Sequence, residues 1–348
     1  MSKIQTLGII GSGQLGSMLC QAAKKMNIKT VVISDDEAGP AINFCDNFIY
    51  SSYKNIENFN KFVNLVDIIT YEFENIPLEI LKAIDKKKKV LPKPKINQIV
   101  QNRRIEKTFI NNLDIKTTEW AFIKSHKDIK KNKSLLPGLL KTNTLGYDGH
   151  GQYIINSLKD VKQDWCFTAE YILEKKVKLK QEISIIITRF NNGETTIYEP
   201  IENIHKNQIL KSSKIPANIS SEIIQTAKAK AQLIAEKLDF VGTMCVEYFI
   251  DLEGRLLVNE IAPRVHNSGH LTINAFNISQ FENHIRAVCN LKKETIKKIS
   301  NAKMNNILGI EIEEYRKKAY KKNEFFFDYL KKEIKEKRKM GHLTILND

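Results

Sequence analysis

Two glutamates, Glu247 and Glu260, flank a segment that predicts a β-hairpin turning at Glu253-Gly254. If those two residues form the turn, pairing outward from it places Glu247 opposite Glu260. Opposed like charges repel by about 3 kcal/mol at a separation of ~5 Å and an effective dielectric of ~20, so a shared proton or a cation must offset them. Oxygen-only ligands favour Mg²⁺ beside a nucleotide, with Mn²⁺ as an alternative. A longer turn with solvated carboxylates is the competing interpretation.

A second group begins at Lys141, which ends an apolar strand and precedes the glycine-rich segment 146–152. Glycine backbone can lay N–H groups along phosphate oxygens while the lysine supplies a point charge. No GK[ST] follows, so the segment is not a Walker loop. A plain surface hairpin remains open from these residues alone.

A third group is the loop Gly11-Ser12-Gly13-Gln14-Leu15-Gly16, between a predicted strand and helix, with Asp35 and Asp36 about twenty residues on. This is the context of a dinucleotide-binding turn, where helix N–H groups hold an anion. The motif indicates an anion without fixing the cofactor as NAD.

The fourth group follows Glu260 without a gap. Arg264, His266, Asn267 and His270 lie within nine residues that carry almost no apolar side chain. So polar a loop leaving a buried strand beside the metal pair predicts a substrate loop.

Alternating strands and helices over the first ~95 residues predict a parallel sheet that positions the first loop. A lysine run and Leu91-Pro92-Lys93-Pro94 then indicate a linker, and a helix is expected from Ile96 to about Asn112. Mixed strands and helices follow, and a lysine-rich tail begins at Lys292. We expect three parts: residues 1–95, residues 96–291 with a subdomain at about 113–173, and residues 292–348.

The composition excludes a disordered, collagen-like or coiled-coil chain. The net charge of +15 reflects scattered lysines, so we expect no specific nucleic-acid partner. The uncharged run Ile4–Ala23 contains too many glycines and glutamines for a membrane span, and five separated cysteines indicate a reducing compartment. We expect a cytoplasmic protein with no membrane partner.

Together, Lys141 with GYDGHGQ, the strand around Glu174 leading to Glu182, the Glu247/Asn259-Glu260 pair and PRVHNSGH resemble the ATP-grasp superfamily. More narrowly, the chain resembles the N5-carboxyaminoimidazole ribonucleotide synthetase family of purine biosynthesis, from GSGQLG to RKMGHL. The resemblance implies an α/β (overall α+β) ATP-grasp fold with an N-terminal Rossmann-like domain and a small β-rich C-terminal region.

The implied activity is that of an ATP-dependent ligase. Bicarbonate attacks the γ-phosphate of ATP to give carboxyphosphate, and the amine of 5-aminoimidazole ribonucleotide takes up the carboxyl group, leaving ADP and phosphate. Relatives are dimers, so a homodimer is expected.

The resemblance also implies site residues. Glu247 and Glu260 match the Mg²⁺ ligands. ATP contacts are expected from Arg103, Lys141, Gly146, Tyr147, Asp148, Gly149, His150, Gly151, Gln152, Glu174, Lys175, Lys176, Val177, Glu182, His205, Asn259 and Glu260. The substrate should contact Gln14, Leu15, Glu72, Tyr147, Arg264, Lys332 and Arg338. The catalytic candidates, with the last three holding bicarbonate or carboxyphosphate, are Asp148, Arg264, His266, Asn267 and His270.

Three alternatives are weighed against this interpretation. Another ATP-grasp ligase with a phosphoribosyl substrate is disfavoured by PRVHNSGH. An NAD-dependent dehydrogenase would use the GSGQLG loop, and a basic nucleic-acid-binding protein would use the net charge.

Overall fold

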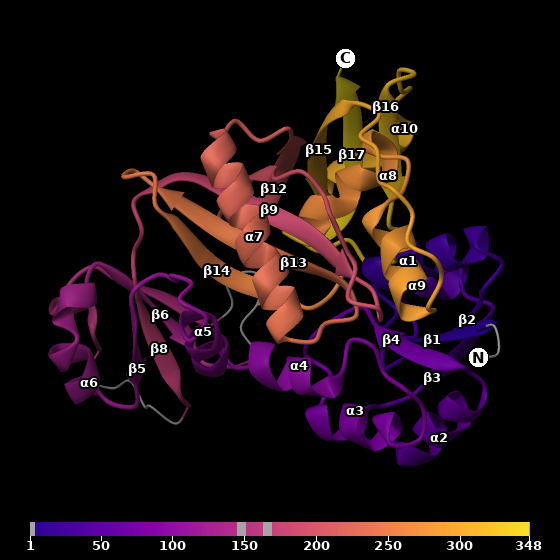
Figure 1. Cartoon of the computed structure of the whole chain (residues 1–348), viewed down its shortest axis with the longest axis horizontal. Helices are drawn as coiled ribbons and strands as arrows, with labels where there is room; N and C mark the ends of the chain where they lie inside the picture. Colours follow the sequence, from indigo (N-terminus) through magenta and orange to yellow (C-terminus); the bar gives the residue numbers. More distant parts are fainter. Residues whose placement is uncertain (1–3, 145–150, 163–168, 348) are drawn as a thin grey trace.

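The computed structural model describes residues 4–144, 151–162 and 169–347. These residues form three β-sheets of four, nine and four strands. In Figure 1 the small sheet of residues 120–175 lies at one end of the molecule, away from the N-terminal sheet. The large sheet lies between them, and its last strands reach the C-terminus.

The N-terminal sheet is parallel, as predicted. Its strands are β1 (Thr6–Ile10), β2 (Lys29–Ser34), β3 (Asn47–Tyr50) and β4 (Ile68–Tyr71), in the order β3-β2-β1-β4. The crossovers contain α1 (Gln14–Lys25), the 3₁₀ turn η1 (Pro40–Asn43) and α2 (Ile56–Asn64), and α3 (Leu78–Asp85) follows β4. The central strands are continuous apolar runs because both faces of a parallel sheet are covered. Leu7, Ile9 and Ile10 of β1, for example, have no exposed surface.

Two helices, not the single one predicted over residues 96–112, join this sheet to the rest. They are α4 (Pro94–Val100) and α5 (Arg103–Asn111). The break occurs at Asn102, whose side-chain oxygen accepts the backbone N–H of Ile105 at 3.0 Å and so begins a new helix. The interruption places Arg103 in the first turn of α5.

The large sheet is antiparallel. Its strands are β9 (Leu179–Arg189), β10 (Thr195–Ile197), β11 (Ile201–Lys206), β12 (Ile209–Ile215), β13 (Gly242–Asp251), β14 (Leu256–Ala262), β15 (Asn301–Leu308), β16 (Glu324–Asp328) and β17 (Lys339–Asn347). The order is β14-β13-β9-β11-β12-β15-β17-β16, with β10 paired to β9. Helix α7 (Ser221–Lys237) covers one face through Ala227, Ala231 and Ile234, which pack against Ile185 and Val246.

The C-terminal strands are part of this same sheet, because β12 pairs with β15. The sheet therefore runs across the predicted division at residue 291, and that division remains a prediction. The same part of the chain contains the 3₁₀ turn η4 (Asn267–Leu271) and the helices α8 (Thr272–Ala275), α9 (Gln280–Val288) and α10 (Glu311–Lys317).

The small sheet is antiparallel, with strands β5 (Trp120–Ile123), β6 (Gly138–Thr142), β7 (Gln152–Ile155) and β8 (Tyr171–Lys175) in the order β5-β8-β6-β7. The helix α6 (His126–Lys131) and the turns η2 (Lys133–Leu135) and η3 (Leu158–Asp160) complete it. Its separate apolar core includes Ile123, Leu140 and Leu173. An independent core lets this unit carry Lys141 opposite the large sheet.

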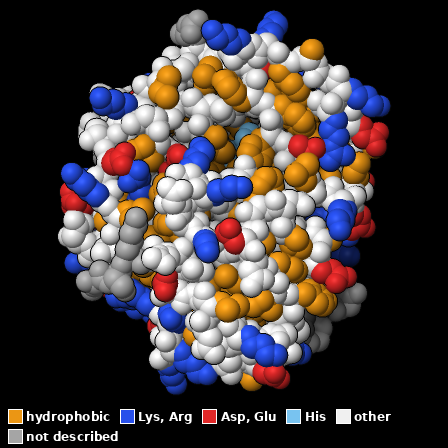
Figure 2. All heavy atoms as spheres, turned by 90° about the vertical axis from the view of Figure 1, so that its right-hand side faces the viewer, with side chains coloured by type: hydrophobic (Ala, Val, Ile, Leu, Met, Phe, Trp, Pro, Cys, Tyr) orange, Lys and Arg blue, Asp and Glu red, His pale blue; other side chains and the backbone are white. Residues whose placement is uncertain are grey.

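The described surface fits the composition. On the face in Figure 2, lysines and arginines lie scattered among acidic and apolar side chains. Within the described ranges, none of the helices is both long and apolar enough to span a membrane. Four cysteines (Cys20, Cys45, Cys245 and Cys289) are free thiols, and Cys166 lies outside the described residues.

Candidate active site

A cavity of about 760 Å³ brings together residues of the large and small sheets, of α1 and α5, and of the loop after β4. It collects most of the residues singled out in the sequence. Those that line it are Gln14, Leu15, Arg103, Lys141, Gln152, Glu174, Lys175, Lys176, Val177, Glu182, His205, Glu247, Asn259, Glu260, Arg264, His266 and Asn267.

The glycine-rich loop is described only in part. Gly146, Tyr147, Asp148, Gly149 and His150 lie outside the described residues. Gly151 adopts φ +70°, and a Cβ there would lie 2.5 Å from the Thr142 hydroxyl, so this position requires glycine.

Glu247 on β13 and Glu260 on β14 are paired residues, which confirms the predicted opposition. The predicted turn is wrong, however. Pairing ends at Ile250–Leu256, and Asp251 N–H donates to Arg255 O at 3.2 Å around a longer loop. The register then shifts by one residue between Glu247 and Tyr248, which restores the pairing of the two glutamates.

Each glutamate has a basic partner. Glu247 Oε1 lies 3.0 Å from His266 Nε2, and Glu260 Oε2 lies 3.1 Å from Arg103 Nη1. Burial alone would raise the pKa of Glu247, but the hydrogen bonds from His266 and Asn259 outweigh it and lower that pKa to about 2. Glu247 is therefore ionised at neutral pH. The carboxylate oxygens of Glu247 and Glu260 are hard ligands of the kind that Mg²⁺ prefers.

Cys245, Glu247 and His266 also bring their ligand atoms within 4.8 Å of one another. A thiol and an imidazole suit a softer cation than Mg²⁺. Burial raises the pKa of the Cys245 thiol well above its usual value, which keeps it protonated. The carboxylate pair is therefore the better site for a hard cation.

Behind this pair lies a buried ionic group that the sequence only partly predicted. Glu174 on β8 accepts from Lys141 Nζ at 2.8 Å, and its other oxygen lies 3.2 Å from Lys107 Nζ. The two lysines outweigh burial and lower the pKa of Glu174 to about 2. Lys107 was missed, although it stands four residues after Arg103 and so on the same face of α5.

Glu106, also on α5, behaves in the opposite way. It is 3% exposed, and its Oε1 accepts the backbone N–H of Ile261 at 2.7 Å. Burial and the nearby charge of Glu260 raise its pKa to about 8. Native Glu106 is therefore mostly protonated at neutral pH.

Glu106→Gln is expected to remove a pH dependence of stability. Unfolded Glu106 ionises near pH 4, so unfolding releases a proton and the free energy of unfolding falls as pH rises from about 4.5 to about 8. Glutamine keeps the oxygen that accepts from Ile261. The variant should therefore match the wild type near pH 4 and exceed it by on the order of 4 kcal/mol at pH 8 in urea unfolding. Glu79→Gln, at an exposed position, is the control, and an unchanged pH profile in Glu106→Gln would contradict this assignment.

Glu182 on β9 and His205 on β11 form a second acid–base contact in the cavity, through Glu182 Oε2 and His205 Nδ1. Burial favours neutral imidazole, but the hydrogen bond and charge of Glu182 raise the pKa of His205. Leu139 on β6 and Phe249 on β13 are apolar residues of the same cavity. The Glu182–His205 pair is suited to hydrogen-bond hydroxyl groups, and the two apolar side chains are suited to pack against a flat base.

The first glycine loop holds a carboxyl group of the protein itself, that of Glu72, whose pKa is raised by burial. Glu72, which follows β4, accepts the backbone N–H groups of Gly13 and Gly16, the latter at 2.6 Å. A Cβ at Gly13 would lie 2.5 Å from Glu72 Oε1, and one at Gly11 would lie 2.5 Å from Glu72 Cγ. These glycines admit the carboxyl group where a dinucleotide-binding turn admits pyrophosphate, which removes the main support for the dehydrogenase hypothesis.

Glu72 itself is 7% exposed, and Gln14 and Leu15 beside it line the cavity. Arg264 donates to Glu74 at 3.0 Å through Nη2. Burial would raise the pKa of Glu74, but the guanidinium outweighs it and lowers that pKa. The loop after β4 thus joins the N-terminal sheet to the Arg264 segment.

Two predicted substrate contacts in the tail, Lys332 and Arg338, are not among the residues that line the cavity. Lys332 is exposed, and Arg338 donates to the Glu333 carbonyl at 3.1 Å, outside the cavity lining. Lys339 instead lines the cavity, and Lys331 is 9% exposed with its charge acting on Glu72. The sequence placed basic residues here, but the fold of the segment between β16 and β17 decides which of them line the cavity.

The structure also places His270 away from the position expected of a ligand for bicarbonate. It has no exposed surface and does not line the cavity, because η4 turns it inward against Phe281 and His342. Burial lowers the pKa of His270 well below its usual value. It packs beneath the substrate loop, so we do not retain it as a ligand for bicarbonate.

Comparisons with known proteins agree with this geometry. Three family models match the chain in order: a ribonucleotide synthetase preATP-grasp domain over residues 4–101, an ATP-grasp domain over residues 108–281 and a phosphoribosylaminoimidazole carboxylase C-terminal domain over residues 302–348. The fold and the site therefore define an ATP-grasp enzyme.

The similarity to individual proteins covers nearly the whole chain. The N5-carboxyaminoimidazole ribonucleotide synthase of Brucella melitensis is 37% identical over 345 residues, covering 97% of this chain and 95% of that protein. A crystal structure of an N5-carboxyaminoimidazole ribonucleotide synthetase with ADP matches with TM-score 0.95 and 38% identity, covering 100% of this chain and 95% of the other. The Aspergillus clavatus enzyme, in complex with ADP and 5-aminoimidazole ribonucleotide, matches with TM-score 0.89 and 27% identity over 100% and 95% of the two chains. The chain belongs to the N5-carboxyaminoimidazole ribonucleotide synthase family of ATP-grasp ligases.

Proposed function

We propose that this cavity carries out the ATP-dependent carboxylation of 5-aminoimidazole ribonucleotide with bicarbonate, a step of purine biosynthesis. The observation that carries the proposal is the Glu247–Glu260 pair facing one cavity with Lys141 and Arg103. Two carboxylates and two basic groups provide the charges needed to hold a magnesium-bound triphosphate.

The metal would be held by Glu247 and Glu260. A bound Mg²⁺ would neutralise part of the phosphate charge. His266 and Asn259 contact Glu247, the latter at 3.4 Å, and orient it. Mn²⁺ shares the preference for oxygen ligands and is expected to substitute.

ATP would lie between the small sheet and the large sheet. The base fits beside Leu139 and Phe249, with the backbone of residues 174–177 reading its edge. Glu182, oriented by His205, would bind the ribose hydroxyls. The phosphates would be held by Arg103 and Lys141 and by the loop residues Gly146, Tyr147, Asp148, Gly149, His150, Gly151 and Gln152.

The reaction forms one bond and breaks one bond in each of two steps. A bicarbonate oxygen attacks the γ-phosphorus, and the bond to the ADP oxygen breaks, giving carboxyphosphate. The substrate amine then attacks the carboxyl carbon, phosphate leaves and the nitrogen loses a proton. Direct transfer and prior release of CO₂ into the cavity give the same products. A closed, charged site protects the mixed anhydride from water.

Residues at the opposite end of the cavity would hold the ribonucleotide and bicarbonate. Gln14, Leu15, Glu72 and Arg264 would contact the ribonucleotide, together with Tyr147 and Asp148. His266 and Asn267 would hold bicarbonate. Lys332 and Arg338 remain the basic groups predicted for the substrate phosphate, and Lys339, which lines the cavity beside Arg338, is a further candidate.

The proposal extends to assembly and location. We propose a homodimer in the cytoplasm and retain the three-part division at residues 95 and 291. The four free thiols are those of a reducing compartment.

ADP release should require 5-aminoimidazole ribonucleotide and bicarbonate together. Because carboxyphosphate forms from bicarbonate and is captured by the amine, omission of either component should reduce the rate at least tenfold. A coupled ADP assay with CO₂-depleted buffer measures this, and ¹⁴C transfer from bicarbonate identifies the product. Turnover that is unchanged without the ribonucleotide would contradict the proposal. Faster turnover with another phosphoribosyl amine would favour a different ATP-grasp ligase.

A further inference from the structure

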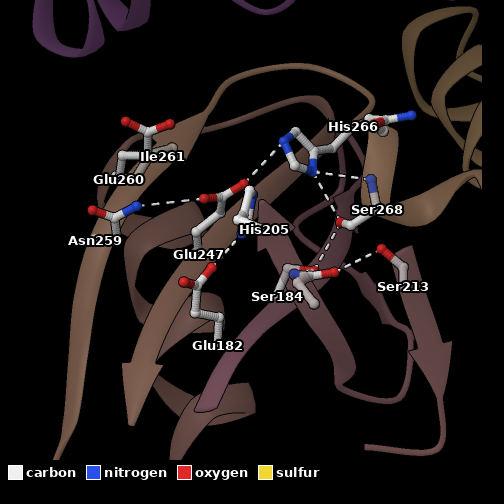
Figure 3. A network of polar contacts seen from close by, with 12 residues as sticks. Glu182, Ser184, His205, Ser213, Glu247, Asn259, Glu260, Ile261, His266 and Ser268 are labelled. Carbon is white, nitrogen blue, oxygen red and sulfur yellow. Dashed lines mark hydrogen bonds and ion pairs between the residues drawn. The ribbon is translucent and has the colours of Figure 1, made fainter. Parts of the chain in front are cut away.

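A continuous chain of buried polar side chains crosses the large sheet and ends at the Glu247 carboxylate (Figure 3). It starts on β12, passes through β11 and β9, and reaches His266 at the start of η4. The successive contacts are Ser213 Oγ to Asn203 Oδ1 at 2.7 Å, Asn203 Nδ2 to Ser184 Oγ at 3.0 Å, Ser184 Oγ to Ser268 Oγ at 2.8 Å, Ser268 Oγ to His266 Nδ1 at 2.9 Å, and His266 Nε2 to Glu247 Oε1 at 3.0 Å.

The polar side chains of this hydrogen-bonded path are almost completely buried. Ser184 and Ser268 have no exposed surface, Ser213 is 1% exposed and Asn203 is 5% exposed. Ile186, two residues further along β9, belongs to the apolar core on this face. Buried hydroxyls are costly unless every donor and acceptor is satisfied, so the value of such a chain lies in what it orients.

The backbone fixes the direction of the hydrogen bonds. The N–H of Ser268 can only donate, and it lies 3.3 Å from His266 Nδ1. Nδ1 therefore presents its lone pair and carries no proton in neutral imidazole. An imidazole ring with no hydrogen on Nδ1 carries one on Nε2, and Nε2 lies 3.0 Å from Glu247 Oε1. The Ser268 hydroxyl, at 2.9 Å from Nδ1, is the closer of the two Ser268 groups that hold this tautomer.

The acceptor at His266 Nδ1 then determines which group donates at each successive contact of the path. Because Nδ1 is an acceptor, the Ser268 hydroxyl must donate to it. Having donated its one hydrogen, Ser268 must accept from Ser184, and Ser184 must in turn accept from the Asn203 amide N–H. The Asn203 oxygen is then left to accept from Ser213, and a flipped amide would place two lone pairs together.

One further group touches this chain. The Cys245 thiol forms hydrogen bonds with Ser268 and Ser184, and burial raises its pKa. A protonated thiol is a weak donor and a weak acceptor. It therefore does not displace the hydroxyl–imidazole contact.

We propose that Ser268, Ser184 and Asn203 are positioning residues that hold His266 in its Nε2–H tautomer, aimed at Glu247, during the carboxylation reaction. They act through His266 and do not line the cavity. The role in the reaction rests on the proposed function, whereas the fixed tautomer rests on the hydrogen bonds alone. Outer partners of this kind typically change activity 10- to 100-fold.

The direct test is ¹⁵N NMR of the histidine rings in the full-length protein, with His266 assigned by its loss in His266→Asn. The wild type should show one neutral tautomer at His266, protonated at Nε2. Ser184→Ala removes the hydrogen that Ser268 accepts and frees its hydroxyl to turn, which leaves only the longer 3.3 Å contact from the Ser268 N–H to hold Nδ1 as an acceptor, so the spectrum should shift toward a mixture. Ser213→Ala, at the far end of the chain, should shift it in the same direction if Ser184→Ala does not fold.

Thr188→Val is the matched control. Thr188 lies four residues along β9 on the same face and is equally buried, and its hydroxyl bonds Thr243 at 2.7 Å without contacting the His266 ring or the hydroxyls that lead to it. It should leave the His266 spectrum and kcat unchanged. Ser184→Ala should lower kcat about tenfold with the KM for ATP unchanged.

The outcomes separate the two proposals. An unchanged tautomer in both alanine variants overturns the inference, and so does a mixed tautomer with an unchanged kcat. A wild-type protein that is inactive with the ribonucleotide and bicarbonate would overturn the proposed function, while the spectra would still decide whether the chain fixes the ring.

Discussion

Glu260→Gln is expected to lower ADP release by about a thousandfold while leaving the fold intact. Glu260 supplies one of two opposed carboxylates, and losing half of a charge-stabilising metal site costs several kcal/mol in the transition state, at 1.36 kcal/mol per factor of ten. The fold should survive because the side chain is 42% exposed and contacts only Arg103 among the ion pairs of the described residues. The measurement is a coupled ADP assay over a range of Mg²⁺ concentrations, with far-UV circular dichroism as the check on folding.

Glu253→Gln is the matched control for this variant. Glu253 lies at the turn of the same hairpin, is 70% exposed and contacts Arg255 at 3.1 Å. It should retain wild-type turnover. If Glu260→Gln turns over at the wild-type rate at every Mg²⁺ concentration, the pair is not the metal site.

Glu174→Gln is expected to cause the largest loss of stability, about 3–5 kcal/mol at pH 7. The carboxylate is 3% exposed and lies between Lys107 and Lys141, so its removal leaves two buried ammonium groups uncompensated. Urea unfolding at pH 7 measures the change. Glu119→Gln is the control. Glu119 forms an exposed ion pair with Lys175, the residue after Glu174 on β8, so its loss should cost at most about 1 kcal/mol.

The ionised Glu174 between its two lysines also predicts that the free energy of unfolding falls at acidic pH. The pKa of Glu174 falls from 4.5 to about 2 on folding, so its contribution is complete above pH 4.5 and is lost as pH falls toward 2. The difference in unfolding free energy between wild type and Glu174→Gln should therefore shrink by on the order of 3 kcal/mol across that range. A constant difference would mean that Glu174 is not ionised between the lysines.

Local patterns in the sequence determined much of this protein. Alternating strands and helices gave the parallel N-terminal sheet, since apolar runs and helix starts are set by neighbouring residues. The paired glutamates were predictable because antiparallel pairing follows from the position of a turn. The turn was nevertheless longer than predicted, and a shift in register of one residue restored the pairing. Motif types and spacing were also sufficient to recognise the family.

The tertiary structure decided which side chains meet across distant elements. Glu72 lies more than fifty residues from the glycine turn that it occupies, and nothing in either segment shows that the group held by that turn is a side chain. Lys107 becomes part of the site only because α5 packs against the small sheet. In the tail, the turn before β17 placed Lys339 in the cavity lining and left Arg338 outside it.

The serine chain is the clearest case. Ser184, Ser213 and Ser268 are unremarkable in the sequence, and they form one path only because β9 and η4 pack together. Local propensity and periodicity depend on neighbours along the chain and can therefore be read from the sequence. Burial, pKa and the direction of a hydrogen bond depend on groups brought together in space, and only the folded chain specifies those.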